Sequence, residues 1–275
     1  MKLALYFDGQ KEKSLALAAE IRSYLKKKDV KSVLNLEEAP DEYFDCVVSL
    51  GGDGSILHLL HSYPDLQAPL LGINLGHLGF MAEVPLEDLF SSLDDLLEGL
   101  YHIEERIMIE GEGPKGKKCF AFNDMVLHRA KIPQLVEFSI YVDGSYFNTF
   151  AADGVILSTP SGSTAYSLAA GGPILSPDLD AFVLTPICPH TISNRPIVFM
   201  PKDRVEIRYL SKCPPIEISF DGVFRDHLNS SESFIMRKAS KKVRLLRLNK
   251  SDYFSILRSK LSWTGGKIRE SVHIF

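Results

Sequence analysis

The spacing of apolar residues changes near residue 100, and this change is the strongest constraint on the fold. Up to that point, compact apolar runs such as residues 3–7 and 45–50 alternate with amphipathic stretches, as in a parallel sheet covered by helices. Beyond it, apolar residues recur at every second position, for example over residues 136–142, which indicates antiparallel strands. The sequence therefore predicts a Rossmann-like α/β domain over residues 1–100 and a β-rich, sandwich-like domain over residues 101–245.

Local signals refine this organisation. Apolar residues at helical spacing predict a helix over residues 14–25, and a proline followed by acidic residues predicts a second helix over residues 85–100. Asp143-Gly144 predicts a type I′ hairpin, because that turn requires positive φ. The segment 246–275 carries scattered apolar residues and is expected to pack back on the body of the protein.

Charge and cysteine content exclude several classes of partner. The chain has 31 basic and 35 acidic residues, so it lacks the overall positive field that holds nucleic acid or an anionic membrane. No apolar stretch reaches the length of a membrane span. The four cysteines lack Cys-x-x-Cys spacing, which fits a reducing, cytoplasmic location. Any anionic ligand must therefore be held locally.

A glycine-rich turn follows the apolar run 45–50. Gly51-Gly52-Asp53-Gly54-Ser55 places bare backbone N–H groups and the start of a helix where a phosphate could bind. A carboxylate beside phosphates is costly unless it accepts a proton or faces a metal, so Asp53 is a candidate general base for an attacking hydroxyl. The alternative is that Asp53 only caps the helix.

A second glycine-rich stretch, residues 111–118, nearly matches a P-loop. Lys118 replaces the hydroxyl residue that would bind Mg²⁺, and the stretch lies between two alternating strands. We therefore predict a hairpin turn there.

Three polar segments in the β-rich part are candidate binding elements. Asn123-Asp124 could contact an adenine edge and a ribose hydroxyl, or could form an Asx turn. Residues 152–173 run from a strand through a hydroxyl-rich loop into a short helix that carries Tyr166, which could stack on a flat ligand or donate a hydrogen bond; helix capping explains only part of this run. Residues 189–198 form a polar loop with His190 and Arg195, suited to anions or an interface, or simply a capped turn.

Together these motifs resemble those of the bacterial NAD kinases. The matching segments are Gly51 to Ser55, Asn123-Asp124, residues 153–173, residues 186–196 and residues 219–222. The resemblance implies transfer of the γ-phosphoryl group of ATP to the 2′-hydroxyl of the adenosine ribose of NAD, with a divalent cation, Mg²⁺ being expected. It also implies a site between an α/β and a β-rich domain, in a homodimer or homotetramer.

The resemblance assigns roles residue by residue. It implies that Asp53 is the proton acceptor and that Gly54 lies beside the dinucleotide, while His58 stands where the family often has a basic residue. The other positions implied to bind the dinucleotide are Asn123, Asp124, Asp153, Thr164, Ala165, Tyr166 and Ala169. Asp124 stands where Glu is frequent, and Ala169 where Ser is frequent. No metal ligand is assigned.

Two other functions remain open from the sequence. The glycine turn is shared with diacylglycerol and sphingosine kinases, so a lipid kinase is one alternative. A non-catalytic NAD(H)-binding sensor is the other, although a sensor would not need the carboxylate of Asp53. A Rossmann dehydrogenase is disfavoured, because no Gly-x-Gly-x-x-Gly follows the first strand.

Overall fold

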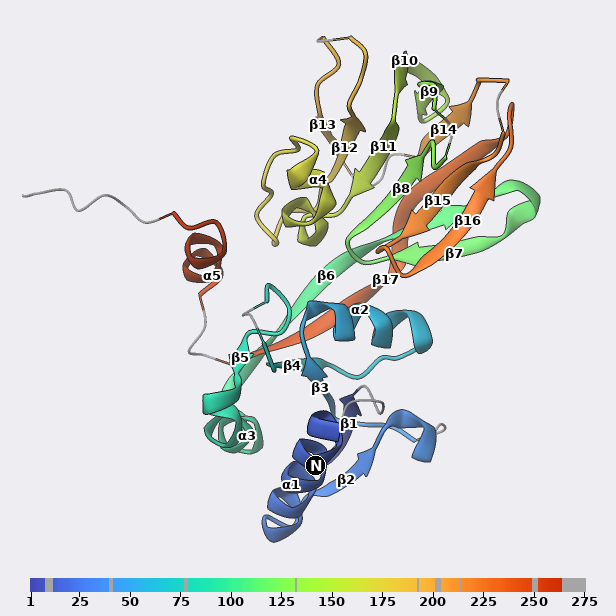
Figure 1. Cartoon of the computed structure of the whole chain (residues 1–275). Helices are drawn as coiled ribbons and strands as arrows, with labels where there is room; N and C mark the ends of the chain where they lie inside the picture. Colours follow the sequence, from blue (N-terminus) through green and yellow to red (C-terminus); the bar gives the residue numbers. More distant parts are fainter. Residues whose placement is uncertain are drawn as a thin grey trace, which may run out of the picture. The chain divides into compact units, whose positions relative to one another are not determined.

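The computed structural model describes residues 1–7, 12–39, 42–76, 79–131, 133–191, 193–200, 204–212, 214–248 and 252–263 (Figure 1). These residues form two compact units, each assembled from separate stretches of the chain. The first, here called the α/β unit, contains Met1–Leu59, Ala68–Glu104 and the described residues from Leu245 onward. The second, the β unit, contains Leu60–Gln67 and Glu105–Arg244. The units thus differ from the expected linear ranges at residues 60–67, at residues 101–104 and after residue 244. Residues 264–275 of the expected terminal segment lie outside the described residues.

The α/β unit is built on parallel strands in the order β17-β4-β3-β1-β2, with β5 beside β4. Its elements are β1 (Lys2–Phe7), α1 (Glu12–Lys27), β2 (Lys31–Leu34), η1 (Leu36–Glu38), β3 (Cys46–Gly51), α2 (Asp53–Ser62), β4 (Leu70–Asn74), β5 (Val84–Pro85), η2 (Leu86–Asp88), α3 (Leu89–Leu97) and α5 (Tyr253–Lys260), together with the end of β17 (Ser233–Leu248). The expected Rossmann-like arrangement is confirmed.

Helices α1 and α3 pack on this sheet through residues at helical spacing. Ile21 and Leu25 of α1 and Leu93 and Leu96 of α3 are fully buried in one apolar cluster with the strands. Helix α3 begins at Leu89, four residues later than predicted. Pro85 has the extended backbone of a strand end, with φ −70° and ψ 155°, and a 3₁₀ turn intervenes.

The β unit contains two antiparallel arrays. One has the order β13-β12-β11-β8-β15-β16, and the other contains β10-β9-β14-β17 with β6 and β7 attached. Their elements are β6 (Tyr101–Glu112), η3 (Pro114–Gly116), β7 (Lys118–Ala121), β8 (Asp124–His128), β9 (Val136–Val142), β10 (Ser145–Ala152), β11 (Gly154–Ser158), η4 (Ser161–Thr164), α4 (Tyr166–Ala169), β12 (Phe182–Ile187), β13 (Ile197–Phe199), β14 (Val205–Tyr209), β15 (Ile216–Phe220) and β16 (Phe224–Leu228). One apolar cluster draws side chains from both arrays, as in a sandwich.

Both predicted hairpins are confirmed. Asp143 and Gly144 have φ of 48° and 78° and join β9 to β10, as a type I′ turn requires. The stretch 111–118 joins antiparallel β6 and β7 and is not a phosphate-binding loop between a strand and a helix. Within the described residues, no helix is both long and apolar enough to cross a membrane.

Candidate functional site

The glycine turn lies at the carboxyl edge of the parallel sheet, where α/β folds place their ligands. Strand β3 ends at Gly51, opposite the last residue of β4, and α2 begins two residues later. A Cβ on Gly51 would lie 2.0 Å from the Ser55 Oγ, so the turn itself requires that glycine. At Gly52 and Gly54, by contrast, a Cβ would meet no described atom within 4 Å, and neither residue has positive φ. Packing therefore does not explain these two glycines, and their bare backbone leaves room for a ligand.

The Asp53 carboxylate binds the backbone of the segment 79–82. Its Oδ1 accepts hydrogen bonds from the N–H groups of Met81 and Ala82, and its Oδ2 accepts one from Phe80, all at 2.9 Å. The segment lies so close that a Cβ on Gly79 would be 1.9 Å from Oδ1. The carboxylate thus holds another loop and does not cap its own helix. Since a carboxylate offers about four acceptor sites, Oδ2 retains capacity for one more partner.

His58 follows Asp53 on α2 and is exposed. Its Nδ1 lies 2.5 Å from the hydroxyl of Tyr6 on β1, and the two rings stack. Asp53, Gly54 and His58 therefore share the α/β unit, and the remaining predicted site residues belong to the β unit.

In the β unit, Asp221 holds the segment 122–124. Its side chain is only 1% exposed. Oδ1 accepts from the N–H groups of Asn123, at 2.7 Å, and Asp124, at 3.1 Å. Oδ2 lies 2.8 Å from both the Phe122 N–H and the His61 Nε2. The Asn123 side-chain amide has no hydrogen bond to any described residue. The bend before β8 is therefore held by the Asp221 carboxylate, in place of the Asx turn considered from the sequence.

Asp124 is buried at the start of β8 beside Asp221. Burial and, second, the charge of Asp221 raise the pKa of Asp124 from 3.8 to about 7, while a backbone hydrogen bond from Tyr166 opposes the rise. Near neutral pH, this carboxyl group is therefore present in both forms. It can accept a hydrogen bond when ionised or donate one when protonated.

The hydroxyl-rich turn packs directly on the Asn123 backbone. The Thr159 N–H donates to the Asn123 carbonyl at 2.9 Å, and the Thr159 hydroxyl donates to the Phe122 carbonyl at 2.7 Å. A Cβ on Gly162 would lie 2.1 Å from the Asn123 carbonyl oxygen, so the turn needs a glycine to approach so closely. The structure thus brings residues 161–166 together with Asn123 and Asp124.

Tyr166 lies at the centre of this group. Its side chain is 44% exposed, and its pKa is raised by burial and then by the charges of Cys188, Asp153 and Asp124. Asp153 accepts a hydrogen bond from the Arg129 Nε at 2.6 Å. Thr164 and Ala165 precede Tyr166, and Ala169 is exposed at the end of the same short helix. The β unit therefore gathers acidic, amide, hydroxyl and aromatic groups at one place.

The remaining polar loop contributes little to this arrangement. His190 and Arg195 are exposed, and the His190 backbone N–H donates to the carbonyl of Ala151. Ile192 of this loop lies outside the described residues.

Sequence reasoning assigned no role to His61 or Asp221, whose contact supports the candidate segment 122–124. Asp221 lies in a segment that resembles the family, residues 219–222, but no local pattern indicates what its carboxylate binds. His61 differs from its helix neighbour His58 only in helical phase, and the partner that distinguishes it lies 160 positions away.

A cavity of about 250 Å³ opens beside this pair in the β unit. Its lining residues are Leu60, His61, Pro64, Met108, Lys117, Cys119, Phe120, Phe220, Asp221 and Lys241. None of the predicted site residues lines it, and its walls are largely apolar. We therefore do not include it in the candidate nucleotide site.

Among the described residues, no group of three or more His, Cys, Asp or Glu side chains is arranged to hold a metal ion. The described chain thus offers no preformed metal cage.

The fold and the site define a class: two-unit nucleotide-binding proteins in which an α/β unit carries an Asp-containing glycine turn and a β unit gathers acidic, amide, hydroxyl and aromatic side chains. Two family models match this chain, the ATP-NAD kinase N-terminal domain over residues 3–101 and the ATP-NAD kinase C-terminal domain over residues 122–248. The chain belongs to the ATP-NAD kinase family. The family expected from the motifs is confirmed.

Individual relatives are similar over nearly the whole chain. The NAD kinase of Protochlamydia amoebophila is 49% identical over 274 residues, covering 96% of this chain and 98% of its own. That of Desulforamulus reducens is 37% identical over 266 residues, covering 90% and 92%.

Solved structures show the same fold. The Archaeoglobus fulgidus NAD kinase, crystallised with ATP, superposes with a TM-score of 0.79 at 26% identity, covering 96% of this chain and 100% of that one. The yeast NADH kinase, crystallised with NADH, gives a TM-score of 0.86 at 23% identity, covering 97% and 88%.

Proposed function

We propose that this chain transfers the γ-phosphoryl group of ATP to the 2′-hydroxyl of the adenosine ribose of NAD, which yields NADP. The observation that carries the proposal is the 49% identity, along 96% of the chain, to a curated bacterial NAD kinase. The expected enzyme class, an ATP-dependent NAD kinase, agrees with both family models. The two glycines that packing does not require, Gly52 and Gly54, provide backbone for phosphate binding.

Catalysis in this proposal rests on alignment and charge stabilisation. The Oδ2 of Asp53 has capacity for one further hydrogen bond and accepts the proton of the attacking ribose hydroxyl. Three backbone donors orient this carboxylate, so its rotation is restricted before the substrate binds. Gly54 and His58 flank it on α2, and both remain proposed contacts.

The β unit supplies the proposed dinucleotide contacts. The Asn123 amide is available to pair with the adenine edge, because the described chain does not use it. Asp124 binds a ribose hydroxyl or an amino group, and Tyr166 offers an exposed ring for stacking. Asp153, Thr164, Ala165 and Ala169 complete the proposed set.

We propose that the divalent cation enters with the substrate and is not held permanently by the protein. Mg²⁺ is usually held by one or two carboxylates together with substrate phosphates and water. The described residues form no cage for it, so we derive no catalytic step from a bound metal. Its place is with the incoming ATP. A homodimeric or homotetrameric assembly and a cytoplasmic location also remain proposals.

The test is incubation of the purified protein with NAD, ATP and Mg²⁺, with NADP detected by a coupled NADP-specific dehydrogenase. Asp53→Asn should lower kcat about 10²–10⁴-fold, the usual contribution of a general base, while NAD still binds. Asp65→Asn, at an exposed aspartate, is the matched control and should not change kcat. Thermal unfolding checks that both variants fold.

Each outcome decides one part of the proposal. Turnover near the wild-type rate in Asp53→Asn would remove Asp53 from the mechanism. No NADP from the wild-type protein would refute the kinase assignment. NAD binding without product would then favour the sensor, and co-sedimentation with liposomes would favour the lipid kinase.

A further inference from the structure

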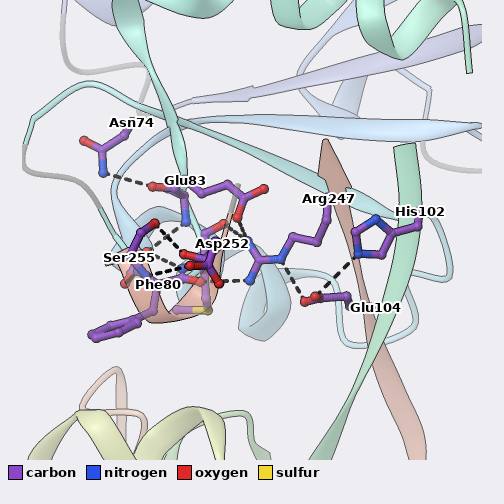
Figure 2. A network of polar contacts seen from close by, with 11 residues as sticks. Asn74, Phe80, Glu83, His102, Glu104, Arg247, Asp252 and Ser255 are labelled. Atoms are coloured by element: carbon purple, nitrogen blue, oxygen red, sulfur yellow. Dashed lines mark hydrogen bonds and ion pairs between the residues drawn. The ribbon is translucent and has the colours of Figure 1, made fainter. Parts of the chain in front are cut away.

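The Arg247 guanidinium, near the end of β17, is buried inside the α/β unit and makes four hydrogen bonds. Its side chain is 7% exposed, and the Glu83 side chain that it binds is 4% exposed. Nη1 donates to the Glu83 Oε2 at 2.7 Å, and Nε donates to the Glu104 Oε2 at 2.9 Å (Figure 2). Two glutamates therefore hold one cation in place.

The same guanidinium also binds the loop that holds Asp53. Nη2 donates to the Phe80 carbonyl at 2.9 Å, and Nη1 donates to the Met81 carbonyl at 3.3 Å. Figure 2 shows Arg247 extended between Glu104 and Phe80. These two bonds are not needed to neutralise the glutamates, and they reach backbone that lies 166 and 167 positions earlier in the chain.

The loop is thus held at both its donors and its acceptors. The N–H groups of Phe80, Met81 and Ala82 donate to Asp53. The carbonyls of Phe80 and Met81 accept from Arg247, and the Ala82 carbonyl accepts from the Asn74 Nδ2 at 3.2 Å. These side-chain bonds add to the one backbone bond within the loop, from the Gly79 N–H to the Ala82 carbonyl, and the loop cannot turn without breaking bonds to Arg247.

We propose that Arg247 is a positioning residue for Asp53. It fixes the carbonyls of the loop, and the loop N–H groups then fix the direction of the carboxylate. This inference rests on the proposed function, in which Asp53 accepts the proton. A displacement of a reacting group by about 1 Å can cost on the order of 10² in rate, so a carboxylate held through a loop depends on what holds the loop.

The geometry requires arginine specifically. A guanidinium presents five N–H donors in a rigid, planar fork, whereas an ammonium group presents three donors from a single point. Lysine at position 247 would retain a positive charge near Glu83 but could not reach both glutamates and both carbonyls. Arg247→Lys therefore separates the neutralising role from the positioning role.

The first experiment compares Arg247→Lys with the wild-type enzyme. We expect kcat to fall about tenfold while the KM values for NAD and ATP stay within about twofold, because positioning affects the chemical step more than binding. Arg258→Lys, at an exposed arginine on α5 of the same unit, is the matched control and should leave kcat unchanged.

The second experiment tests whether Arg247 acts through Asp53. If it does, adding Arg247→Lys to Asp53→Asn should cause no further loss of kcat, because the carboxylate being positioned is already gone. Independent effects would multiply, so a further tenfold loss in the double variant would overturn the proposal. A wild-type kcat in the single Arg247→Lys variant would also overturn it.

A second variant, in which the buried charges are removed together, is available if Arg247→Lys does not fold. Removing one partner of a buried ion pair leaves an uncompensated charge, whereas replacing both is tolerated better. If Arg247→Lys does not fold, Arg247→Met with Glu83→Gln and Glu104→Gln takes its place, with the same expected and overturning results. Failure of the proposed function is seen separately, as absence of NADP from the wild-type enzyme.

Discussion

Two buried carboxyl groups lie next to each other in the β unit, and their surroundings differ. Asp221 has four hydrogen-bond partners, three of them backbone N–H groups. Asp124 is opposed by the Asp221 charge and receives one backbone hydrogen bond. Burial and the Asp221 charge raise the pKa of Asp124 to about 7, so this carboxyl group is partly protonated near neutral pH.

This proton makes stability depend on pH. The pKa of Asp124 rises from 3.8 to about 7 on folding, so the folded state binds the proton more tightly than the unfolded state does. The resulting stabilisation is fully present below about pH 4 and is lost as pH rises through 7. Asp124→Asn remains neutral, so its free energy of unfolding should exceed that of the wild type increasingly from pH 5 to 8, by at most about 4 kcal/mol.

Urea denaturation at several pH values measures this difference. Asp65→Asn is the control, because that carboxylate is almost fully exposed and its substitution should not change the pH dependence. An Asp124→Asn curve parallel to the wild-type curve between pH 5 and 8 would show that the Asp124 carboxyl group does not retain its proton.

At the scale of the element, the glycine turn combines residues needed for folding with residues that folding does not need. Gly54 lies in the first turn of α2, where alanine favours a helix by about 1 kcal/mol. Its added methyl group would meet no described atom. Gly54→Ala should therefore keep or raise the melting temperature, yet it should lower kcat/KM for ATP or NAD at least about tenfold, because the methyl group occupies ligand space.

Gly162→Ala provides the contrast for this prediction. Its methyl group would meet the Asn123 carbonyl, so the melting temperature itself should fall. Melting temperature and kcat/KM are measured for both variants. If Gly54→Ala left kcat/KM unchanged, the open backbone of this turn would not be part of the nucleotide site.

How well the sequence predicts these elements depends on how far apart the interacting residues lie along the chain. The glycine turn and the 143–144 hairpin depend on neighbouring residues and could be predicted from local spacing. The partners of Asp221 and Arg247 include residues 160 and 164 positions away, which no local pattern indicates. The alternative role for Asp53, a helix cap, also came from local reasoning. It was wrong because the segment 79–82, which is distant in sequence, supplies donors to the carboxylate.

At the scale of the whole molecule, the order of elements along the chain does not match their grouping in space. Strand β17 continues from the β unit into the α/β unit, where Leu245 pairs with Leu70 of β4. Leu246 and Leu248 are buried in the same core cluster as α1 and α3. The linear boundary predicted near residue 100 follows the change in periodicity, but periodicity does not reveal that a distant strand completes the first sheet.

This arrangement predicts that residues 1–104 do not fold by themselves. Such a fragment leaves the start of β4 without its β17 partner, lacks two core leucines and leaves Glu83 buried without its cation. An unpaired buried charge costs about 3–5 kcal/mol, a large share of the roughly 5–15 kcal/mol that stabilises a domain.

A short Gly-Ser linker from Glu104 to residues 245–263 should restore folding, because Arg247 binds Glu104 directly. The readout is a cooperative urea transition followed by circular dichroism, expected for the linked fragment and not for residues 1–104. Replacing Leu246 and Leu248 with serine in the linked fragment should abolish the transition, whereas a cooperative transition in residues 1–104 alone would show that the α/β unit is stable without β17.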